Sequence, residues 1–264
     1  VRARFCVVRA LYELIRSAIP LIDLRRFQEQ HNIAHLLAFS KGRLFPALKD
    51  GIFSRSLQLT RDYSEVPAVV VNRGTSTADR RKEDKTVFMQ VLRVLEDRGK
   101  HTLRSVDKRG SGKQSWVMTF EGEGGSDYGG LFRDSLREMC SELQASPGAL
   151  RLLLPCPNQR YGTGDNQDKW IPNPDLRAPQ HLRLFRFVGA LMGASVRAQS
   201  SMELDLPSLV WKVFVGENAT LGDVAGIDEP FAKEVRAARD ATADEWASRP
   251  RYWVVRSASG RLVP

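Results

Sequence analysis

The segment that decides the fold runs from Trp116 to Asp134 and reads WVMTFEGEGGSDYGGLFRD. Its first residues place Trp116, Met118 and Phe120 at alternate positions. Such alternation is typical of a strand with one buried face. A glycine-rich turn follows, and apolar residues then recur at helical spacing. The segment therefore predicts a strand, a tight turn and the start of a helix.

The turn combines glycines with acidic residues. Asp127 is placed to cap the following helix by accepting hydrogen bonds from its free backbone N–H groups, and Gly129 and Gly130 permit positive φ or close backbone packing. The glycine spacing fits neither GxxxxGK[ST] nor GxGxxG, and the carboxylates of Glu121, Glu123 and Asp127 would repel phosphate. We therefore interpret the acidic group as helix capping and turn solvation rather than as a metal or nucleotide site.

Hydrophobic periodicity predicts an α+β fold dominated by helices. Before the turn it predicts helices at residues 5–19, at 27–38 and after Pro46, a buried strand at 69–71, an exposed loop at 74–84 and a helix at 86–95. After the turn it predicts helices following Gly130, from Pro179, at 206–216 and at 231–246, strands at 152–154 and 252–255, and a loop at 158–174. The pair Gly189 and Gly193 suggests that the helix from Pro179 packs tightly on a neighbour.

Several stretches resemble, in the same order along the chain, the N-lobe of HECT-type E3 ubiquitin ligases. The segment quoted above is similar to the family's signature of a strand ending in Phe, then Gly-Glu, Asp, Gly-Gly and an Arg-acid pair. Further resemblances occur at residues 155–158, 170–174, 184–193, 204–207, 211–212, 223 and 227–228. Together they cover roughly residues 69–228. Residues 42–50 also resemble the helical segment that precedes the HECT domain in large, HERC-like members.

The resemblance implies structural rather than chemical roles for the residues that carry it. Ser126 stands where an aliphatic residue is common, and Asp134 stands where Glu is common. Trp211, like Trp116 and Trp170, is expected to pack in a core or between lobes. The signature residues are Phe120, Glu121, Gly122, Asp127, Gly129, Gly130, Arg133, Asn173, Pro174, Gly189, Gly193, Trp211 and Lys212.

The resemblance also implies a domain order. Residues 1–62 would form a helical N-terminal extension, residues 63–84 a connector strand and exposed loop, and residues 85–264 part of a HECT N-lobe. The family's N-lobe continues beyond the position of Pro264 through the region that docks the E2. A smaller C-lobe with a catalytic cysteine in a Thr-Cys-Phe-like context then follows, so we expect that cysteine to lie outside this chain.

The activity that the resemblance implies belongs to the parent protein. A HECT ligase accepts ubiquitin from an E2 thioester onto the C-lobe cysteine by transthiolation, and a substrate lysine then attacks this second thioester. The implied partners are a ubiquitin-charged E2, ubiquitin and a protein substrate, and no cofactor or metal is implied. Residues 1–264 would be a rigid scaffold that brings the reacting groups together, with no ligase activity of their own.

The chain contains three cysteines, Cys6, Cys140 and Cys156, without a CxxC pair. This odd count argues against a disulfide framework or a zinc site and favours a reducing, intracellular and most simply cytoplasmic location. Cys6 and Cys140 lie among apolar residues and are expected to be buried structural thiols. Cys156 lies between two prolines and is open to exposure, but no histidine is near it in sequence. None of the three is expected to be a thioester nucleophile.

Two alternatives remain open at this point. The first is a non-catalytic HECT-like module that binds partners without transferring ubiquitin. The second is a basic nucleic-acid-binding protein, motivated by 40 Lys and Arg against 31 Asp and Glu, a net charge of +9. The basic residues are scattered through every segment, so this second alternative is the least favoured. No run of about 18 uncharged apolar residues exists, so no membrane span is predicted.

Overall fold

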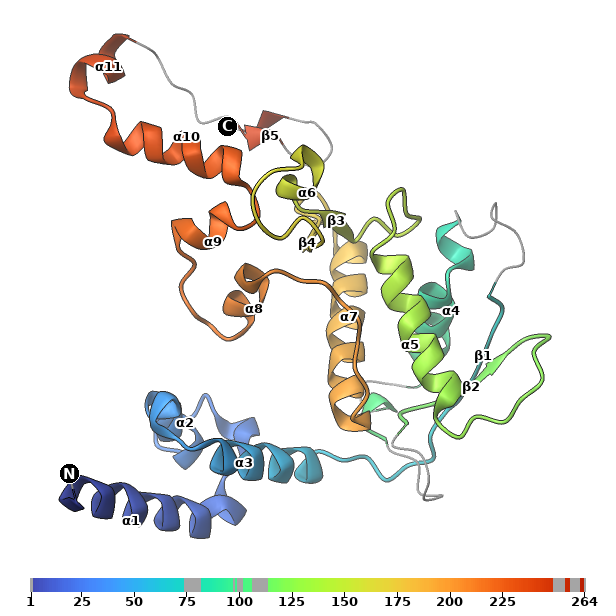
Figure 1. Cartoon of the computed structure of the whole chain (residues 1–264). Coiled ribbons are helices and arrows are strands. Elements are labelled where there is room, and N and C mark those ends of the chain that lie inside the picture. The colour runs from blue at the N-terminus through green and yellow to red at the C-terminus, as the bar shows by residue number, and fades with distance from the viewer. Residues whose placement is uncertain are drawn as a thin grey trace.

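A computed structural model describes residues 2–73, 82–96, 98, 102–105, 114–248, 255–256 and 262–263. Within these residues the α-helices are α1 (Arg2–Ala18), α2 (Ile33–Phe39), α3 (Pro46–Leu59), α4 (Val87–Glu96), α5 (Gly130–Leu143), α6 (Pro157–Tyr161), α7 (Pro179–Ala198), α8 (Ser208–Phe214), α9 (Leu221–Ala225), α10 (Glu229–Asp240) and α11 (Ala243–Ser248). The strands are β1 (Ala68–Val71), β2 (Val117–Phe120), β3 (Leu153–Pro155), β4 (Trp170–Pro172), β5 (Val255–Arg256) and β6 (Leu262–Val263). The fold is α+β with helices dominant, as the sequence predicts (Figure 1).

The main core is built on a small parallel sheet. β1 and β2 pair in parallel, with Val69 opposite Met118 and Val71 opposite Phe120, and α4 lies between the two strands in the chain. Val69 and Val71 are buried, whereas Val70 is exposed. The strand predicted at residues 69–71 is therefore confirmed, but it buries one face only.

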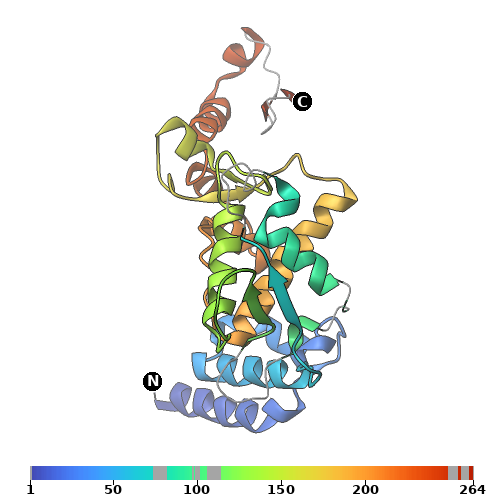
Figure 2. The ribbon, with the colours of Figure 1, turned by 90° about the vertical axis from the view of Figure 1, so that its right-hand side faces the viewer.

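Three long helices, α4, α5 and α7, pack beside this sheet (Figures 1 and 2). Phe88 of α4 meets Phe187 of α7 edge to face, with ring centroids 5.2 Å apart. Trp116, just before β2, tilts against Phe132 of α5 with centroids 4.5 Å apart. Each of these four side chains is buried, and burial of one such side chain stabilises a fold by roughly 1.5–3 kcal/mol. These contacts fix the strand-to-helix corner on the core.

The loop predicted at residues 158–174 contains most of α6 and all of β4, so that prediction was wrong in part. Pro157 stands in the first turn of α6, where its missing N–H costs no hydrogen bond. β4 pairs antiparallel with β3, placing Ile171 opposite Leu154. Both α6 and β4 are too short to show a hydrophobic period, which is why the sequence did not reveal them.

Other boundaries differ from the predictions. α2 begins only at Ile33, because the side chain of Asn32 accepts a hydrogen bond from the backbone N–H of Ala34 and caps the helix there. The single helix predicted at 231–246 is divided into α10 and α11, because Ala241 has an extended conformation. Of the strand predicted at 252–255, only residue 255 is described, and most of the loop predicted at 74–84 lies outside the described residues.

The N-terminal helices have a small core of their own, formed by Ile15, Ile22, Ala34, Leu48 and Ile52. α1 and α3 lie side by side at the opposite end of the molecule from α10 and α11 (Figure 2). In the middle of α3, a Cβ on Gly51 would lie 2.9 Å from Ile19 Cδ1. Glycine at this position therefore lets α3 approach the end of α1 closely.

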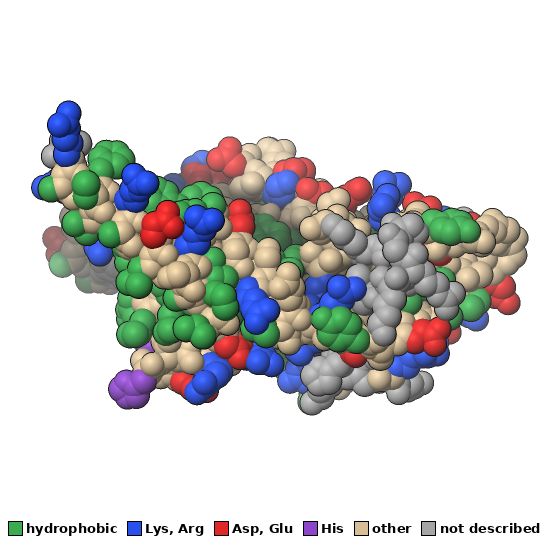
Figure 3. Space-filling view, turned by 90° about the horizontal axis from the view of Figure 1, so that it is seen from below, with side chains coloured by type: hydrophobic (Ala, Val, Ile, Leu, Met, Phe, Trp, Pro, Cys, Tyr) green, Lys and Arg blue, Asp and Glu red, His purple; other side chains and the backbone are tan. Residues whose placement is uncertain are grey.

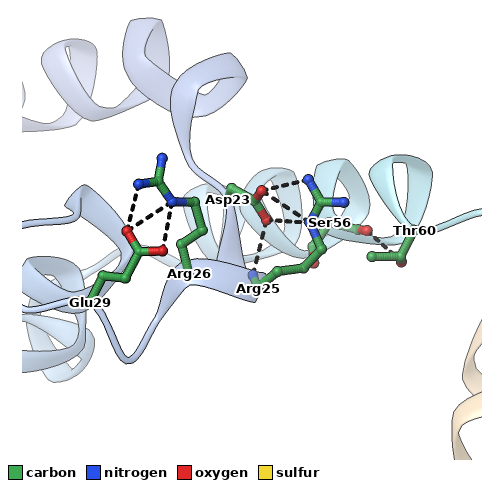
Figure 4. A network of polar contacts seen from close by, with 6 residues as sticks. All are labelled: Asp23, Arg25, Arg26, Glu29, Ser56 and Thr60. Carbon is green, nitrogen blue, oxygen red and sulfur yellow. Dashed lines mark hydrogen bonds and ion pairs between the residues drawn. The ribbon is translucent and has the colours of Figure 1, made fainter.

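Ion pairs hold the turn between α1 and α2 (Figure 4). Asp23 pairs with Arg25, whose Nη2 lies 2.6 Å from its carboxylate, and Arg26 pairs with Glu29. Hydrogen bonds from Arg25 lower the pKa of Asp23 to about 2.

No described helix combines the length and apolar character that crossing a bilayer requires.

Candidate functional site

The carboxylate of Asp127 joins β2 to α5. Its Oδ2 accepts a hydrogen bond from the backbone N–H of Met118 at 2.8 Å, and its Oδ1 accepts from Gly129 at 2.7 Å and from Phe132 at 3.4 Å. The expected capping role is therefore confirmed, and the same side chain also fixes the strand. Hydrogen bonds to an ionised acceptor are about twice as strong as neutral ones, so this carboxylate is well suited to hold the corner.

Glycine is required at one position of the corner. Gly129 has φ +97° and is buried, and a Cβ there would lie 3.5 Å from Gln114 Oε1. An L side chain rarely adopts this left-handed conformation. Gly130, which was predicted to share this role, has no positive φ and open space where a Cβ would stand. Gly122 adds a second positive φ, +81°, where the chain leaves β2.

Two acidic residues of the turn contact Asn72 and Arg73, which directly follow β1. The guanidinium of Arg73 lies 3.5 Å from the centre of the Phe120 ring, and Arg73 Nε lies 3.2 Å from Glu123 Oε1. Glu121 accepts a hydrogen bond from Asn72 Nδ2 at 3.1 Å. Among the described residues, no group of His, Cys, Asp and Glu is arranged to hold a metal ion. These carboxylates thus link two neighbouring strands, whereas Arg133 lies exposed on α5.

A second part of the signature lies at the end of the β3–β4 hairpin. Asn173 is buried, and its Nδ2 donates to the backbone carbonyl of Arg151 at 3.0 Å while its Oδ1 accepts from the N–H of Asp175 at 3.1 Å. Pro174 is exposed and its carbonyl accepts a hydrogen bond from Arg177 Nε. Asn173 therefore fixes the chain as it leaves β4 towards α7.

The expected close packing of Gly189 and Gly193 is not found. Both glycines lie on the exposed side of α7, and a Cβ added to either would have no neighbour within 4 Å among the described residues. The buried side of the helix carries Leu184, Phe187 and Leu191 instead. The prediction failed because a glycine pair at helical spacing does not reveal which side of the helix it occupies.

The third part of the signature links α8 to α9. Lys212 Nζ lies 2.7 Å and 2.9 Å from the two carboxylate oxygens of Asp223, and Asp223 also forms a capping box with Thr220. The hydrogen bonds from Lys212 and from Thr220 lower the pKa of Asp223 to about 2, and Lys212 has the largest effect. Trp211, predicted to be packed, is 46% exposed, with its Nε1 donating to the carbonyl of Leu206.

Asn158 belongs to the resemblance at residues 155–158, but its sequence context does not indicate what its side chain contacts. This residue is fully buried, and its Nδ2 donates to the carbonyls of Asp165 and Ala225, at 3.0 Å each. Its Oδ1 accepts from the N–H of Glu229 at 2.7 Å. One carboxamide thus ties α6, the following loop and the start of α10 together. The residues joined are as many as 71 positions apart, so no local pattern could have indicated them.

One cysteine differs from its expected environment, and the exposure of another had been left open. Cys6 is exposed, not buried, and Cys156 is fully buried, with Sγ donating to the carbonyl of Asn166 at 2.9 Å. Cys140 is buried as expected beside a pocket of about 430 Å³, and its burial raises the pKa of the thiol to about 11. In the described part of the chain, no hydrogen bond joins a histidine to any of these thiols.

A buried thiol with a raised pKa is a poor nucleophile, because the thiolate is the reactive form. Cys140 is therefore unsuited to carry a thioester, and Cys156 is fully buried, where a ubiquitin thioester could not reach it. The signature residues come together in three places, the β2–α5 corner, the β3–β4 hairpin and the α8–α9 link. In each place the contacts are those of a rigid support, and they bring no nucleophile next to a base.

The chain is similar in sequence to one protein family and to several known proteins. The family described as HECT-domain (ubiquitin-transferase) matches residues 139–254. The human E3 ubiquitin-protein ligase HERC2 is 31% identical over 99% of this chain. The probable human E3 ubiquitin-protein ligase HECTD4 is 30% identical over 82% of it. The E3 ubiquitin-protein ligase RSP5 of Chaetomium thermophilum is 26% identical over 47% of it.

These matches differ in extent. The chain spans 6% of the length of HERC2 and of HECTD4, and 14% of the length of RSP5. The β2–α5 corner lies outside the range of the family match, but the match with HERC2 includes both the corner and the N-terminal helices. From the family match and from the identity over nearly the whole chain, this protein belongs to the HECT-domain (ubiquitin-transferase) family.

Proposed function

We propose that residues 1–264 are the scaffold portion of a HECT-class E3 ubiquitin transferase. The observation that carries this proposal is the similarity to HERC2 along 99% of the chain. The state of the thiols supports it, because Cys140 and Cys156 are buried and no hydrogen bond among the described residues joins either of them to a histidine. The thioester-forming cysteine would then lie in a C-lobe outside residues 1–264.

The proposed reaction proceeds in two exchanges. The C-lobe thiolate attacks the carbonyl carbon of the thioester between ubiquitin and the E2, and the E2 thiolate leaves. A lysine amine of the protein substrate then attacks the new thioester, forming an isopeptide bond and releasing the C-lobe thiolate. The energy is already stored in the first thioester, so the proposal requires no metal, nucleotide or other cofactor at this protein.

The part played by residues 1–264 would be positional. Holding two reactants in a fixed geometry can contribute a large share of a rate enhancement. The buried contacts of Asp127, Asn158 and Asn173 are suited to such a support, because each fixes two or more backbone segments. The division into an extension at 1–62, a connector at 63–84 and an N-lobe portion from 85 is part of the same proposal.

The partners in this proposal are a ubiquitin-charged E2, ubiquitin and a protein substrate, in an intracellular and most simply cytoplasmic setting. Three thiols with no CxxC pair support that setting. The signature residues named above would act as structural supports rather than as reacting groups.

The test uses the full reading frame from which the chain comes. The purified protein is incubated with E1, ATP, ubiquitin and a panel of E2 enzymes, and the products are separated with and without reducing agent. We expect a reducible ubiquitin adduct on a cysteine outside residues 1–264. Binding of charged E2 without any adduct would instead favour a non-catalytic HECT-like module, and the transferase proposal would be abandoned.

A further inference from the structure

The N-terminal helices expose an unusual amount of apolar surface. Thirteen of the 23 exposed large hydrophobic side chains in the described part of the chain lie between Phe5 and Phe53. Figure 3 shows hydrophobic side chains gathered at this end of the molecule, over α1–α3. Soluble monomers rarely expose contiguous apolar patches larger than a few hundred Å². This end of the chain is therefore a candidate interaction surface.

The most regular part of this surface is a row of side chains along α1. Val7, Leu11 and Leu14 are 68%, 44% and 67% exposed, and their spacing of four and then three residues is the spacing at which one helix packs along another. Ala18 continues the row by four more residues. Ile15, on another side of α1, is buried in the N-terminal core. We call the row Val7–Leu11–Leu14–Ala18 the α1 seam.

The surroundings of the α1 seam favour a helix over a lipid surface. Ala3, Ala10 and Ser17 lie along one edge of the seam, and small residues let a second helix approach closely. In helices that lie in a membrane interface, Trp or Phe usually accompanies Leu on the inserted face, whereas the α1 seam has Leu11 and Leu14 but no aromatic residue. The one aromatic exposed on this helix, Phe5, is nine residues from Leu14 and so lies about 180° around the axis from it.

The charge of this region indicates what kind of helix would bind. Residues 1–62 contain eleven Lys and Arg against five Asp and Glu, so their net charge of +6 makes up most of the +9 of the whole chain. Basic residues do occur in every segment, but the excess of positive charge is concentrated here. Among the described residues, no carboxylate forms an ion pair with Arg4, which lies next to Leu11 around the axis of α1, whereas Arg2, Arg9 and Arg16 lie on the other side of the helix and contribute only to the overall charge.

A second copy of the chain is a poor occupant for the same reason. Two such surfaces would bring net charges of the same sign together, which opposes association. An acidic partner would be attracted instead, and it would also remove apolar surface from water. Arg4 occupies the seam position seven residues before Leu11, where it is placed to meet a carboxylate at the end of a docked helix.

We infer that the α1 seam is a docking site for an acidic amphipathic helix of another protein. The partner helix would lie along α1, with apolar side chains on Val7, Leu11 and Leu14 and a carboxylate facing Arg4. This inference stands on α1 and on the charge of residues 1–62, and it does not depend on the proposed transferase function.

The test uses the whole chain and synthetic helices of about three heptads. One fluorescent peptide has Leu at its seam positions and Glu beside them, and two matched peptides have Lys or Gln in place of Glu. We expect the Glu peptide to bind, with anisotropy titrations giving an affinity about tenfold above that of the Lys peptide, a difference of about 1.4 kcal/mol. Added salt should reduce this preference.

Variants of α1 distinguish docking at the α1 seam from nonspecific hydrophobic binding. L14E and L11E should each weaken binding of the Glu peptide about tenfold, as expected for residues at the centre of an interface. F5E is the matched control, an equally exposed apolar residue of the same helix on the opposite side from Leu14, and it should bind as the unaltered chain does. R4E should weaken binding of the Glu peptide but not of the Gln peptide.

Several results would overturn the inference. These are equal binding of the Glu and Lys peptides, no binding of either by the unaltered chain, or an F5E variant that loses as much affinity as L14E. Dimerisation of the chain at micromolar concentration that L14E abolishes would assign the seam to a second copy. Binding to phosphatidylcholine–phosphatidylserine vesicles that depends on Leu14, without binding of the Glu peptide, would assign it to an anionic lipid surface.

Discussion

Arg197 of α7 donates a hydrogen bond through Nη2 to Thr60 Oγ1 at 2.6 Å, across 137 residues of sequence. Its Nη1 also donates to the carbonyl of Leu57 at 3.1 Å, and Thr60 itself donates to the carbonyl of Ser56 (Figure 4). Carbonyls in the last turn of a helix have no partner within the helix. Arg197 therefore caps the end of α3 and fastens the N-terminal helices to the main core.

Replacing Arg197 should loosen this attachment. Burial and the nearby charge of Arg104 lower the pKa of Arg197, but the side chain remains charged at neutral pH. In R197M the carbonyl of Leu57 keeps only its longer contact with Thr60 Oγ1, at 3.4 Å, and Thr60 loses the donor that Arg197 supplies. We expect this to lower the free energy of unfolding by about 1–3 kcal/mol. Limited proteolysis should cut faster between α3 and β1. R186M, on the exposed side of α7, is the control and should behave as the unaltered chain.

Removing the carboxylate of Asp127 should destabilise the β2–α5 corner. In D127A the N–H groups of Met118 and Gly129 lose their acceptor, and we expect a loss of about 2 kcal/mol in a urea denaturation measurement. D127N keeps one oxygen acceptor and should lose less. Equal stability of D127A and the unaltered chain would show that the corner does not depend on this residue.

Asn158 offers a test of the support beneath α10. N158A removes two donors and one acceptor from the partly buried backbone groups of Asp165, Ala225 and Glu229, so we expect a loss of about 2–4 kcal/mol. Hydrogen exchange should rise at the N–H of Glu229 and along the first turn of α10. N158D keeps an acceptor for Glu229 and should protect that N–H better than N158A does. Unchanged exchange in N158A would contradict the role assigned to this carboxamide.

The pair of Lys212 and Asp223 predicts a dependence of stability on acid. The pKa of Asp223 is lowered from 3.8 to about 2, so its contribution is complete above about pH 4 and is lost as the pH falls towards 2. The side chain of Asp223 is only 9% exposed. In K212M this part of the acid sensitivity should shrink, whereas the part due to Asp23 should remain. Identical pH profiles for the two proteins between pH 5 and 2 would rule out this linkage.

The three thiols should differ in reactivity. Under native conditions a thiol-specific reagent should modify Cys6 alone, because Cys140 and Cys156 are buried. All three should react in denaturant, and C6S should leave the native protein unreactive. Rapid modification of Cys140 at neutral pH would contradict a thiol whose pKa is raised to about 11.

The elements that the sequence predicts are those in which a hydrophobic repeat continues over several turns or strand positions. α1, α4 and α5 were predicted because apolar residues recur over three or more turns, and the strand ending in Phe120 because its buried positions alternate. α6 and β4 have no such period. They are ordered by partners distant in sequence, such as Asp205, whose carbonyl accepts the N–H of Trp170.

In the candidate site, too, the contacts between residues close in sequence were predictable and those between distant residues were not. The capping by Asp127 followed from its position before a predicted helix, whereas the contacts of Asn158 and Arg197 join residues 71 and 137 positions apart. The burial of Cys6 was predicted wrongly because apolar neighbours in sequence do not show which side of α1 meets a core. Local pattern thus reveals local contacts, and tertiary packing decides the others.

The most direct test of the account is a single-turnover transfer experiment. An E2 charged with labelled ubiquitin is mixed with the purified 1–264 chain or with the protein of the full reading frame, and adducts are separated without reducing agent. The account predicts no thiol-reducible adduct on residues 1–264 and one on the full-length protein. A reducible adduct on the 1–264 chain that C6S or C156S removes would contradict it.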